Sequence, residues 1–398
     1  MSEKRTNSPR KKILWISSLI MDIHLHKTSQ IEILRALAKR GHGVCLLATY
    51  SSRREALGLQ DISSCQIPLK YVPLFSNMAY DILLFLYLPL LMLRYAPDFV
   101  IVEPEPTVLS LIPIFFFPRA RKPKFILDIR STPIGVFGIS GRLKELFFAI
   151  AIFVARKFFQ GITIITELMK KDVCKNYNVK PEFMGVWTSG VSLSTFCSDR
   201  GSRVEMRKTF AIDDKFVILY HGVLGSLQVK RGIVETIKAI GLLKTKYPDL
   251  VLFLLGRGDL PLDRLIQESG LENMVVAKDT VSYFEVPKYV AMADIGIVPL
   301  PDLPDWRYQC PLNLLECLAS EKVVVATDIP ANTMILGNSK CGILASSSDP
   351  RDLAKAIAYA YENRKKLAQW GSYGRTLIDK NYSWTKVAAK LETHLLGL

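Results

Sequence analysis

Residues 215–232 read KFVILYHGVLGSLQVKRG and lead into an apolar helical pattern. The apolar run predicts a buried strand, and the pattern predicts a helix directly after a glycine-rich turn. Glycines let the backbone approach a ligand, and the first amides of a helix bind anions. We therefore interpret the turn as a candidate pyrophosphate cradle, the alternative being an ordinary turn with solvated basic side chains. The cradle residues are Gly222, Gly225, Lys230 and Arg231.

Similar apolar runs recur along the whole chain and alternate with helical patterns. They lie at 13–19, 44–50, 99–103, 124–129 and 161–166, and then at 215–222, 250–258, 274–277, 295–300, 323–328 and 341–346. This alternation is typical of parallel sheets with crossover helices. We predict an α/β protein with two Rossmann-like, doubly wound parallel-sheet domains that face each other across a cleft, because ligands bind beyond the carboxyl ends of such strands.

The length of 398 residues predicts two domains at roughly 150 residues each. A polar stretch at 199–214 precedes a fresh strand and is the predicted linker. We therefore expect an N-terminal domain at 1–198, a second domain at 215–381 and a terminal helix at 382–398.

The charge is unevenly distributed. The formal net charge is +15, of which residues 1–200 contribute +12, from 27 basic and 15 acidic side chains. We expect the first half to meet an anionic partner. The base-reading motifs and stacking aromatics of nucleic-acid binders do not appear, so we expect no nucleic acid.

Seven cysteines form no C-x-x-C pair, which fits neither a disulfide framework nor a zinc site and predicts a reducing cytosol. The basic start is followed by an apolar stretch at 13–20 that is too short for a secretion signal.

Three apolar clusters crowd the first half, at 82–93, 108–118 and 146–155. Each is shorter than the roughly 20 residues of a spanning helix, and Pro89 and Pro113 interrupt two of them. Core helices with solvated basic ends and shallow insertion into an anionic membrane surface remain equally open. The basic flanks are Arg119, Arg121, Lys122, Lys124, Arg142, Lys144, Arg156 and Lys157.

Further polar residues follow the strands of the second half. Gly256-Arg257-Gly258 closes one strand and Ser282 follows another. In PLNLLECLA, at 311–319, Pro311 suits the first turn of a helix. Glu316 on that helix is placed to accept hydrogen bonds from ribose hydroxyls, and the alternative is an exposed helix acid.

Four segments of the second half occur in a family-specific order: YHGVLGSLQVKRGIVETIKAI, FLLGRG, VPKYVAMADIGIVPL and PLNLLECLASEKVVVATDIPA. Together they resemble the C-terminal donor domain of retaining GT-B glycosyltransferases of family GT4 (glycosyl transferase group 1). LAKRGHGV at 37–44, WTSGVSLSTF at 187–196 and YSWTKVAAKLETHLL at 382–396 are similar to the family's first helix, interdomain hairpin and terminal helix.

The resemblance implies roles for individual residues. Lys230 and Arg231 would neutralise the diphosphate of a UDP- or GDP-sugar, and Glu316 would hold the ribose. The amides at Pro311, Leu312 and Asn313 would meet the distal phosphate, and the backbone near Arg257 and Ser282 would frame the base. Tyr308 is a departure, since it stands where the family's E-x7-E pattern has its first glutamate. Asp302 or Asp305 would have to substitute for it.

In the first half, polar residues follow two predicted strand ends and could orient either an acceptor hydroxyl or the donor sugar. They are Glu103, Glu105, Asp128 and Arg130. Asp128 is the preferred general base by position, and a structural ion pair with Arg130 is equally open. His24 and His26 lack a third ligand, and we find no Asp-x-Asp, so we expect no metal and no cofactor besides the donor. We expect His221 to be a near-core residue.

The overall expectation is retaining transfer of a sugar from a nucleotide diphosphate sugar to a lipid-linked or glycan acceptor, by an enzyme peripheral on the cytoplasmic face of a membrane. The 1–198 domain would bind the acceptor, and 215–381 would bind the donor. A GT-B nucleotide-sugar epimerase and an inactive pseudo-glycosyltransferase subunit are the alternatives, the second because of Tyr308.

Overall fold

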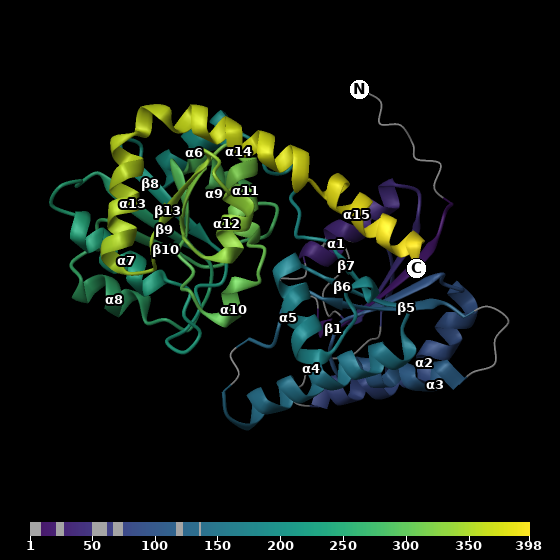
Figure 1. Cartoon of the computed structure of the whole chain (residues 1–398). Helices are drawn as coiled ribbons and strands as arrows, with labels where there is room; N and C mark the ends of the chain where they lie inside the picture. Colours follow the sequence, from purple (N-terminus) through teal and green to yellow (C-terminus); the bar gives the residue numbers. More distant parts are fainter. Residues whose placement is uncertain (1–8, 21–27, 50–61, 67–74, 117–121, 135–136) are drawn as a thin grey trace. The chain divides into compact units, whose positions relative to one another are not determined.

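A computed structural model describes residues 9–20, 28–49, 62–66, 75–116, 122–134 and 137–398 (Figure 1). The chain forms two compact units. The N-terminal unit comprises Met1–Thr188 together with Trp384–Leu398, and the C-terminal unit comprises Ser189–Ser383. Each is described by itself.

The N-terminal unit is built on a seven-stranded parallel sheet of order β3-β2-β1-β4-β5-β6-β7. Its strands are β1 (Lys12–Ile20), β2 (Gly43–Thr49), β3 (Ser63–Gln66), β4 (Phe99–Val102), β5 (Lys124–Ile129), β6 (Gly161–Ile164) and β7 (Met184–Val186). Its helices are α1 (Thr28–Lys39), α2 (Phe75–Tyr95), η2 (Pro106–Leu111), α3 (Ile112–Phe116), α4 (Gly138–Phe158), α5 (Glu167–Tyr177), η3 (Pro181–Phe183) and α15 (Trp384–Gly397).

Helices α1 and α15 cover one face of this sheet, and α2, α3 and α4 lie on the other (Figure 1). Trp15 of β1 and Leu391 of α15 are buried in the same core cluster. The buried Glu392 carboxylate of α15 accepts hydrogen bonds from the Arg40 guanidinium, with Nε at 2.7 Å, and lies 2.8 Å from His42 Nε2. The last helix therefore completes the core of the first unit.

The C-terminal unit has a six-stranded parallel sheet of order β10-β9-β8-β11-β12-β13. Its strands are β8 (Phe216–His221), β9 (Leu250–Leu255), β10 (Val275–Lys278), β11 (Ile295–Val298), β12 (Val323–Thr327) and β13 (Gly342–Ala345). Its helices are α6 (Arg200–Thr209), α7 (Ile233–Leu243), α8 (Leu262–Glu268), α9 (Val286–Met292), α10 (Pro304–Arg307), α11 (Leu312–Ala319), α12 (Pro330–Leu336), α13 (Pro350–Glu362), η4 (Arg364–Lys366) and α14 (Leu367–Asn381).

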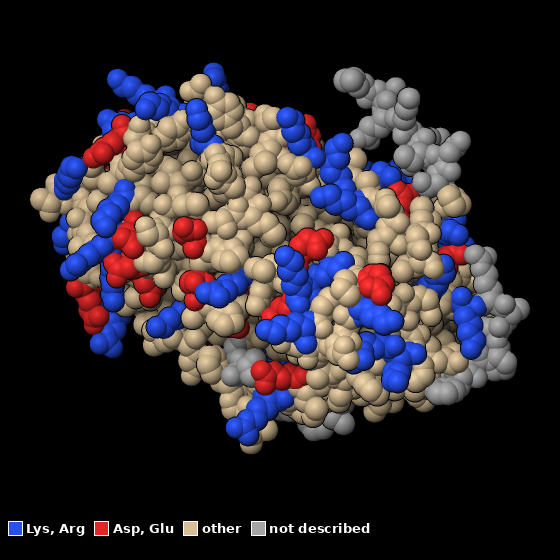
Figure 2. All heavy atoms as spheres, viewed as in Figure 1, with Lys and Arg blue, Asp and Glu red and all other residues tan. Residues whose placement is uncertain are grey.

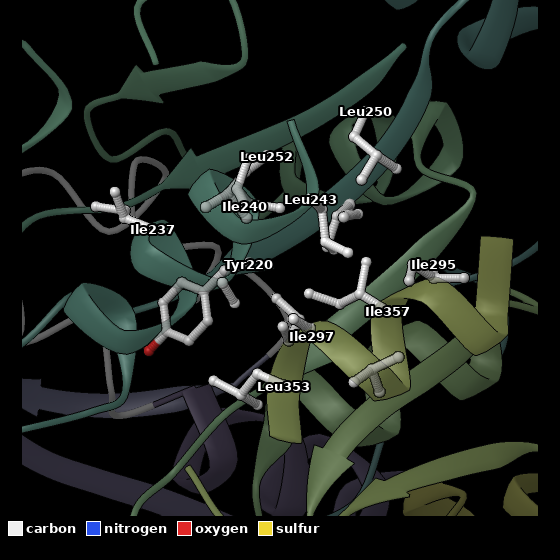
Figure 3. Packing of buried hydrophobic residues seen from close by; sticks show 14 of the residues in the cluster. Tyr220, Ile237, Ile240, Leu243, Leu250, Leu252, Ile295, Ile297, Leu353 and Ile357 are labelled. Carbon is white, nitrogen blue, oxygen red and sulfur yellow. The ribbon is translucent and has the colours of Figure 1, made fainter. Parts of the chain in front are cut away.

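The core of this unit lies between the sheet and helices α7 and α13. Ile237 of α7 and Ile357 of α13 pack toward Leu252 and Ile297 of the central strands (Figure 3). Strands β8, β9, β11 and β12 are buried along their whole length, as expected of a parallel sheet covered by helices on each side. The predicted fold class is confirmed, and every predicted strand corresponds to a strand of the structure.

The predicted linker at 199–214 is wrong. Residues 200–209 form helix α6, and Arg203 and Arg207 of this helix bind opposite oxygens of Asp294, each at 2.6 Å. These polar residues are therefore anchored inside the C-terminal unit, and the observed division falls between Thr188 and Ser189.

The apolar cluster at 82–93 lies within one continuous helix, α2, which runs through Pro89. The expected interruption at Pro89 is therefore wrong. Burial of Leu84, Leu88 and Leu91 on the sheet side offsets the missing backbone hydrogen bond. Within the described ranges, no helix has both the length and the apolar character to cross a bilayer.

Candidate functional site

The sheet of the C-terminal unit has a switch point at β8. Its neighbours are β9 on one side and β11 on the other, so the crossover connections leave in opposite directions. A crevice opens at such a point, beyond the carboxyl ends of the strands. The segments that follow β8, β9 and β11 supply most of the predicted donor-binding residues.

The turn after β8 is rigidly held by backbone contacts. Leu224 N donates to the Arg257 carbonyl oxygen at 2.9 Å, and Gly225 bridges to Gly258 in the loop after β9. Gly225 has φ +82°, and a Cβ there would collide with the Val229 carbonyl oxygen. Side-chain-bearing residues are strained in this conformation, so glycine is required for the tight turn.

Gly232 begins α7 with φ +80°, and a Cβ there would collide with the Pro299 carbonyl oxygen. The loop after β8 and the loop after β11 are therefore in direct backbone contact. This contact keeps Lys230 and Arg231, which precede Gly232, at the switch point.

Trp306 positions the two basic residues. The Arg231 guanidinium lies 4.4 Å from the centre of the Trp306 ring, and the indole Nε1 donates to the Lys230 carbonyl oxygen at 2.9 Å. Arg231 Nε is buried and makes no hydrogen bond to a described residue. A guanidinium held by an aromatic face, with a spare donor, is well suited to bind a phosphate.

Helix α11 begins a few residues after Trp306 in the sequence. Pro311 is its N-cap, and Asn313 Nδ2 donates to the His221 carbonyl oxygen at 3.3 Å, which joins α11 to the end of β8. Pro311 has no N–H, so the expectation of an amide at this position is wrong. The amides that can meet a phosphate are those of Leu312 and Asn313, because the first amides of a helix have no intrahelical partner.

Glu316 lies one turn further along α11 and is only 7% exposed, which excludes the exposed helix acid. Its Oε2 is 3.5 Å from His221 Nδ1. Burial raises the pKa of Glu316 to about 8 and lowers the pKa of His221 to about 4. Both groups are therefore predominantly uncharged near neutral pH, and the expectation of a near-core His221 is confirmed by its burial.

The residues expected near the base lie at the ends of the neighbouring strands β9 and β10. The exposed Arg257 side chain makes a bidentate pair with Asp279, at 3.1 and 2.5 Å. Ser282 N donates to Glu285 Oε2 at 3.2 Å. The Arg257 carbonyl and the Ser282 amide already have partners within the unit.

Tyr308 directly follows the short helix α10 and is half-buried. Asp302, one of the two candidates for replacing the missing glutamate, is held by Arg307 through a bidentate pair at 2.6 and 2.7 Å. Its charge is therefore neutralised locally. Asp305 lies in the first turn of α10.

The candidates of the N-terminal unit lie at the end of β5. Asp128 is fully buried, and its Oδ1 accepts hydrogen bonds from Thr163 Oγ1 at 2.6 Å and Trp187 Nε1 at 2.8 Å. Burial raises the pKa of Asp128 to about 6, opposed by Arg130 and by these two hydrogen bonds. A carboxylate buried among structural partners cannot reach an acceptor in this conformation, so its assignment as general base is not supported.

Arg130 stacks on Trp187, with the guanidinium 3.7 Å from the ring centre, and its NH1 donates to the Trp187 carbonyl oxygen at 2.8 Å. Its side chain is half-buried, as are Glu103 and Glu105 after β4. Unlike Asp128, these three side chains are partly accessible for an acceptor.

No group of three His, Cys, Asp or Glu side chains suited to a metal ion occurs in the part of the chain that the structure describes. His24 and His26 lie outside the described residues.

Sequence reasoning missed Trp306 and Trp187, the two rings that hold Arg231 and Arg130. A tryptophan in the otherwise polar segment PDLPDWRY was the available signal for Trp306. No comparable signal pointed to Trp187.

The two parallel-sheet units define the fold as that of the GT-B class, and family comparison agrees. Residues 202–377 match the model for glycosyl transferases group 1. This match confirms, for these residues, the resemblance to glycosyl transferases group 1 that was drawn from the sequence.

Two curated relatives illustrate the similarity. D-inositol 3-phosphate glycosyltransferase of Paenarthrobacter aurescens (strain TC1) is 26% identical over 182 residues, which cover 44% of this chain and 42% of the relative. GDP-mannose-dependent alpha-(1-6)-phosphatidylinositol monomannoside mannosyltransferase of Mycolicibacterium smegmatis (strain ATCC 700084 / mc(2)155) is 25% identical over 212 residues, which cover 52% and 55%. The chain spans about half the length of the curated relatives it matches.

Solved structures match over almost the whole chain. A glycosyltransferase from Rickettsia africae ESF-5 has a TM-score of 0.76 at 16% identity, covering 98% of this chain and 99% of that one. Anabaena Alr3699/HepE in complex with UDP has a TM-score of 0.72 at 15% identity, covering 98% and 100%. At such identities the likeness shows the fold alone.

Proposed function

We propose that this protein transfers a sugar from a nucleotide diphosphate sugar, UDP- or GDP-linked, to an acceptor with retention of configuration. The observation that carries the proposal is the Arg231–Trp306 stack, which holds a cation with a spare donor in the loop after β8. A diphosphate leaving group needs such preorganised cations and amides where its charge grows.

Each part of this site has a role in the proposal. Lys230, Arg231 and the amides of Leu312 and Asn313 stabilise the departing diphosphate, and the glycines at 222 and 225 let it approach the backbone. Glu316 binds the ribose hydroxyls. These groups account for charge neutralisation without a resident metal ion.

We further propose a lipid-linked acceptor and a peripheral position on the cytoplasmic face of a membrane. The excess of basic residues in the first 200 positions supports this, as does the relative whose name specifies a phosphatidylinositol monomannoside. In this proposal the N-terminal unit binds the acceptor, with Arg130 and Glu103 as its partly accessible polar groups.

The inactive pseudo-glycosyltransferase is the second candidate. Tyr308 replaces the expected glutamate, and Arg307 neutralises Asp302, so the sugar of the donor lacks one carboxylate partner. Such a subunit retains nucleotide binding or loses it, but in either case transfers nothing.

Two experiments test the proposal. The first screens UDP- and GDP-sugars for thermal stabilisation of the purified chain. The second measures transfer of a labelled sugar from the stabilising donor to extracted membrane lipids. We expect one nucleotide series to raise the melting temperature and its sugar to reach the lipid fraction. Absence of any nucleotide effect contradicts it. Stabilisation with no transfer favours the inactive subunit, and conversion of the donor incubated alone identifies the epimerase.

A further inference from the structure

The solvent side of helix α2 is mainly apolar between residues 82 and 93. Ile82, Leu86, Leu90 and Leu93 follow one another at helical spacing along its solvent side, and the last three are 63%, 62% and 68% exposed. The opposite side, with Leu84 and Leu88, is fully buried. Helices at the surface of a water-soluble unit normally place charged residues outward, so this exposed apolar side is suited to an interaction surface.

Helix α4 carries a second apolar stripe. Ile139, Leu143, Leu146 and Phe153 share one side of it, and Ile139 is 87% exposed. Both helices pack against η2, and Figure 1 shows them on the same face of the sheet. The eight exposed side chains, Ile82, Leu86, Leu90 and Leu93 of α2 with Ile139, Leu143, Leu146 and Phe153 of α4, are referred to here as the docking face. Isolated exposed leucines are ordinary, but a patch extending over two helices marks an interaction site.

Basic residues border the docking face. Arg142 and Lys157 lie on the same or adjoining side of α4 as its apolar stripe, and Arg94 ends α2. All three side chains are exposed. In Figure 2, Lys and Arg side chains lie next to uncharged surface on the N-terminal unit. Apolar side chains beside cations are the composition of surfaces that enter the headgroup region of anionic bilayers.

We propose that the docking face inserts into the headgroup and upper acyl region of a bilayer that contains anionic lipids. Charge decides between this occupant and a second copy of the chain. Two copies joined through this face would bring their own arginines and lysines together, whereas anionic headgroups neutralise them. Since no described helix can span, both helices lie along the surface.

The same helix reaches the carboxyl edge of the N-terminal sheet. Tyr80, near the start of α2, donates from its hydroxyl to the Ser17 carbonyl oxygen of β1 at 2.8 Å. Ser17 Oγ lies 3.5 Å from Glu103 Oε2, just beyond β4. Docking therefore brings a lipid headgroup to the edge that carries Glu103. The docking face deepens the proposed peripheral position at a membrane, and this last step also rests on the proposed lipid-linked acceptor.

A sedimentation assay tests the proposal. The full chain is mixed with phosphatidylcholine vesicles, either with or without phosphatidylglycerol. We expect binding to the phosphatidylglycerol vesicles that weakens with added salt. Leu90→Glu should lower the partition coefficient about tenfold, because it removes a buried apolar contact and adds a like charge to that of the lipid. The charge reversal Arg142→Glu/Lys157→Glu should abolish the preference for phosphatidylglycerol.

Leu242→Glu is the matched control, because Leu242 is similarly exposed, at 58%, on α7 of the other unit. It should sediment like the unmodified chain. Failure of the unmodified chain to bind either vesicle, or equal loss in the control, overturns the proposal. So does a dimer in light scattering that Leu90→Glu dissociates. Thermal stabilisation by nucleotide sugars, measured on the same samples, shows independently whether the donor site is intact.

Discussion

The Trp306 ring lies against the Arg231 guanidinium at 4.4 Å, while its indole N–H holds the carbonyl oxygen of Lys230. One side chain from helix α10 thus fixes the Arg231 guanidinium and the backbone of Lys230 in the loop after β8. A flexible arginine would lose rotamer entropy on binding a phosphate, and a stacked one has already lost much of it.

Arg231→Ala should weaken binding of the nucleotide diphosphate by about 1.5–3 kcal/mol, the contribution of a charge-assisted hydrogen bond. Isothermal titration calorimetry with UDP and GDP measures it. Arg264→Ala, which removes an exposed arginine of α8 in the same unit, is the control and should leave the affinity unchanged. Unchanged affinity in Arg231→Ala would remove this residue from the cradle.

Trp306→Leu should weaken the same binding by about 0.5–2 kcal/mol, because the cation loses its aromatic support. Trp306→Phe keeps a ring and loses only the indole hydrogen bond, so its dissociation constant should lie between those of the unmodified chain and Trp306→Leu. Equal affinity in both variants would indicate that the ring has no positioning role.

Glu316→Gln should change how stability depends on pH. The pKa of this glutamic acid rises from 4.5 unfolded to about 8 folded, so the folded chain holds the proton over that range and its stability falls as pH rises. His221 acts oppositely, because its pKa falls from 6.5 to about 4 and stability rises with pH in that interval.

Between pH 6.5 and 8, Glu316 is the one member of this pair that still makes the free energy of unfolding depend on pH. Urea unfolding followed over that interval should give a decline of up to about 1.4 kcal/mol per pH unit in the unmodified chain, reduced in Glu316→Gln. Parallel curves for the two proteins would contradict the assigned protonation.

Glu392→Gln should destabilise the N-terminal unit by about 3 kcal/mol, since it leaves Arg40 and His42 without their shared carboxylate in a buried position. Hydrogen exchange should show α15 opening first. Glu362→Gln, at an exposed pair with Lys246, is the matched control and should have little effect. Similar exchange of α15 in both variants would refute the proposed anchor.

Much of the fold could be predicted because the strands are continuous apolar runs, and such runs are typical of parallel sheets. β3, with the sequence SSCQ, and the three-residue β7 escaped detection because they are short edge strands with little apolar signal. The segment 199–214 was predicted to be a linker because its composition is polar. In the folded unit, however, its arginines bind Asp294 and backbone carbonyl oxygens.

The candidate donor site could be predicted where glycine or charged residues lie in a segment that follows an apolar strand, as at Gly225, Arg231 and Glu316. Asp128 shows the limit of that rule, since position after a strand does not reveal whether a side chain faces solvent or the core. Its partners Thr163 and Trp187 are 35 and 59 positions away in sequence, and such pairings depend on tertiary packing.

Helix α15 has a consequence for biosynthesis. The ribosome makes residues 384–397 after all of the C-terminal unit, yet Leu391 and Trp384 belong to the core of the first unit. The nascent first half must therefore wait, with part of its apolar interior uncovered, while the second half is translated and collapses independently. A chaperone that shields the α1 side of the early sheet would act during that interval.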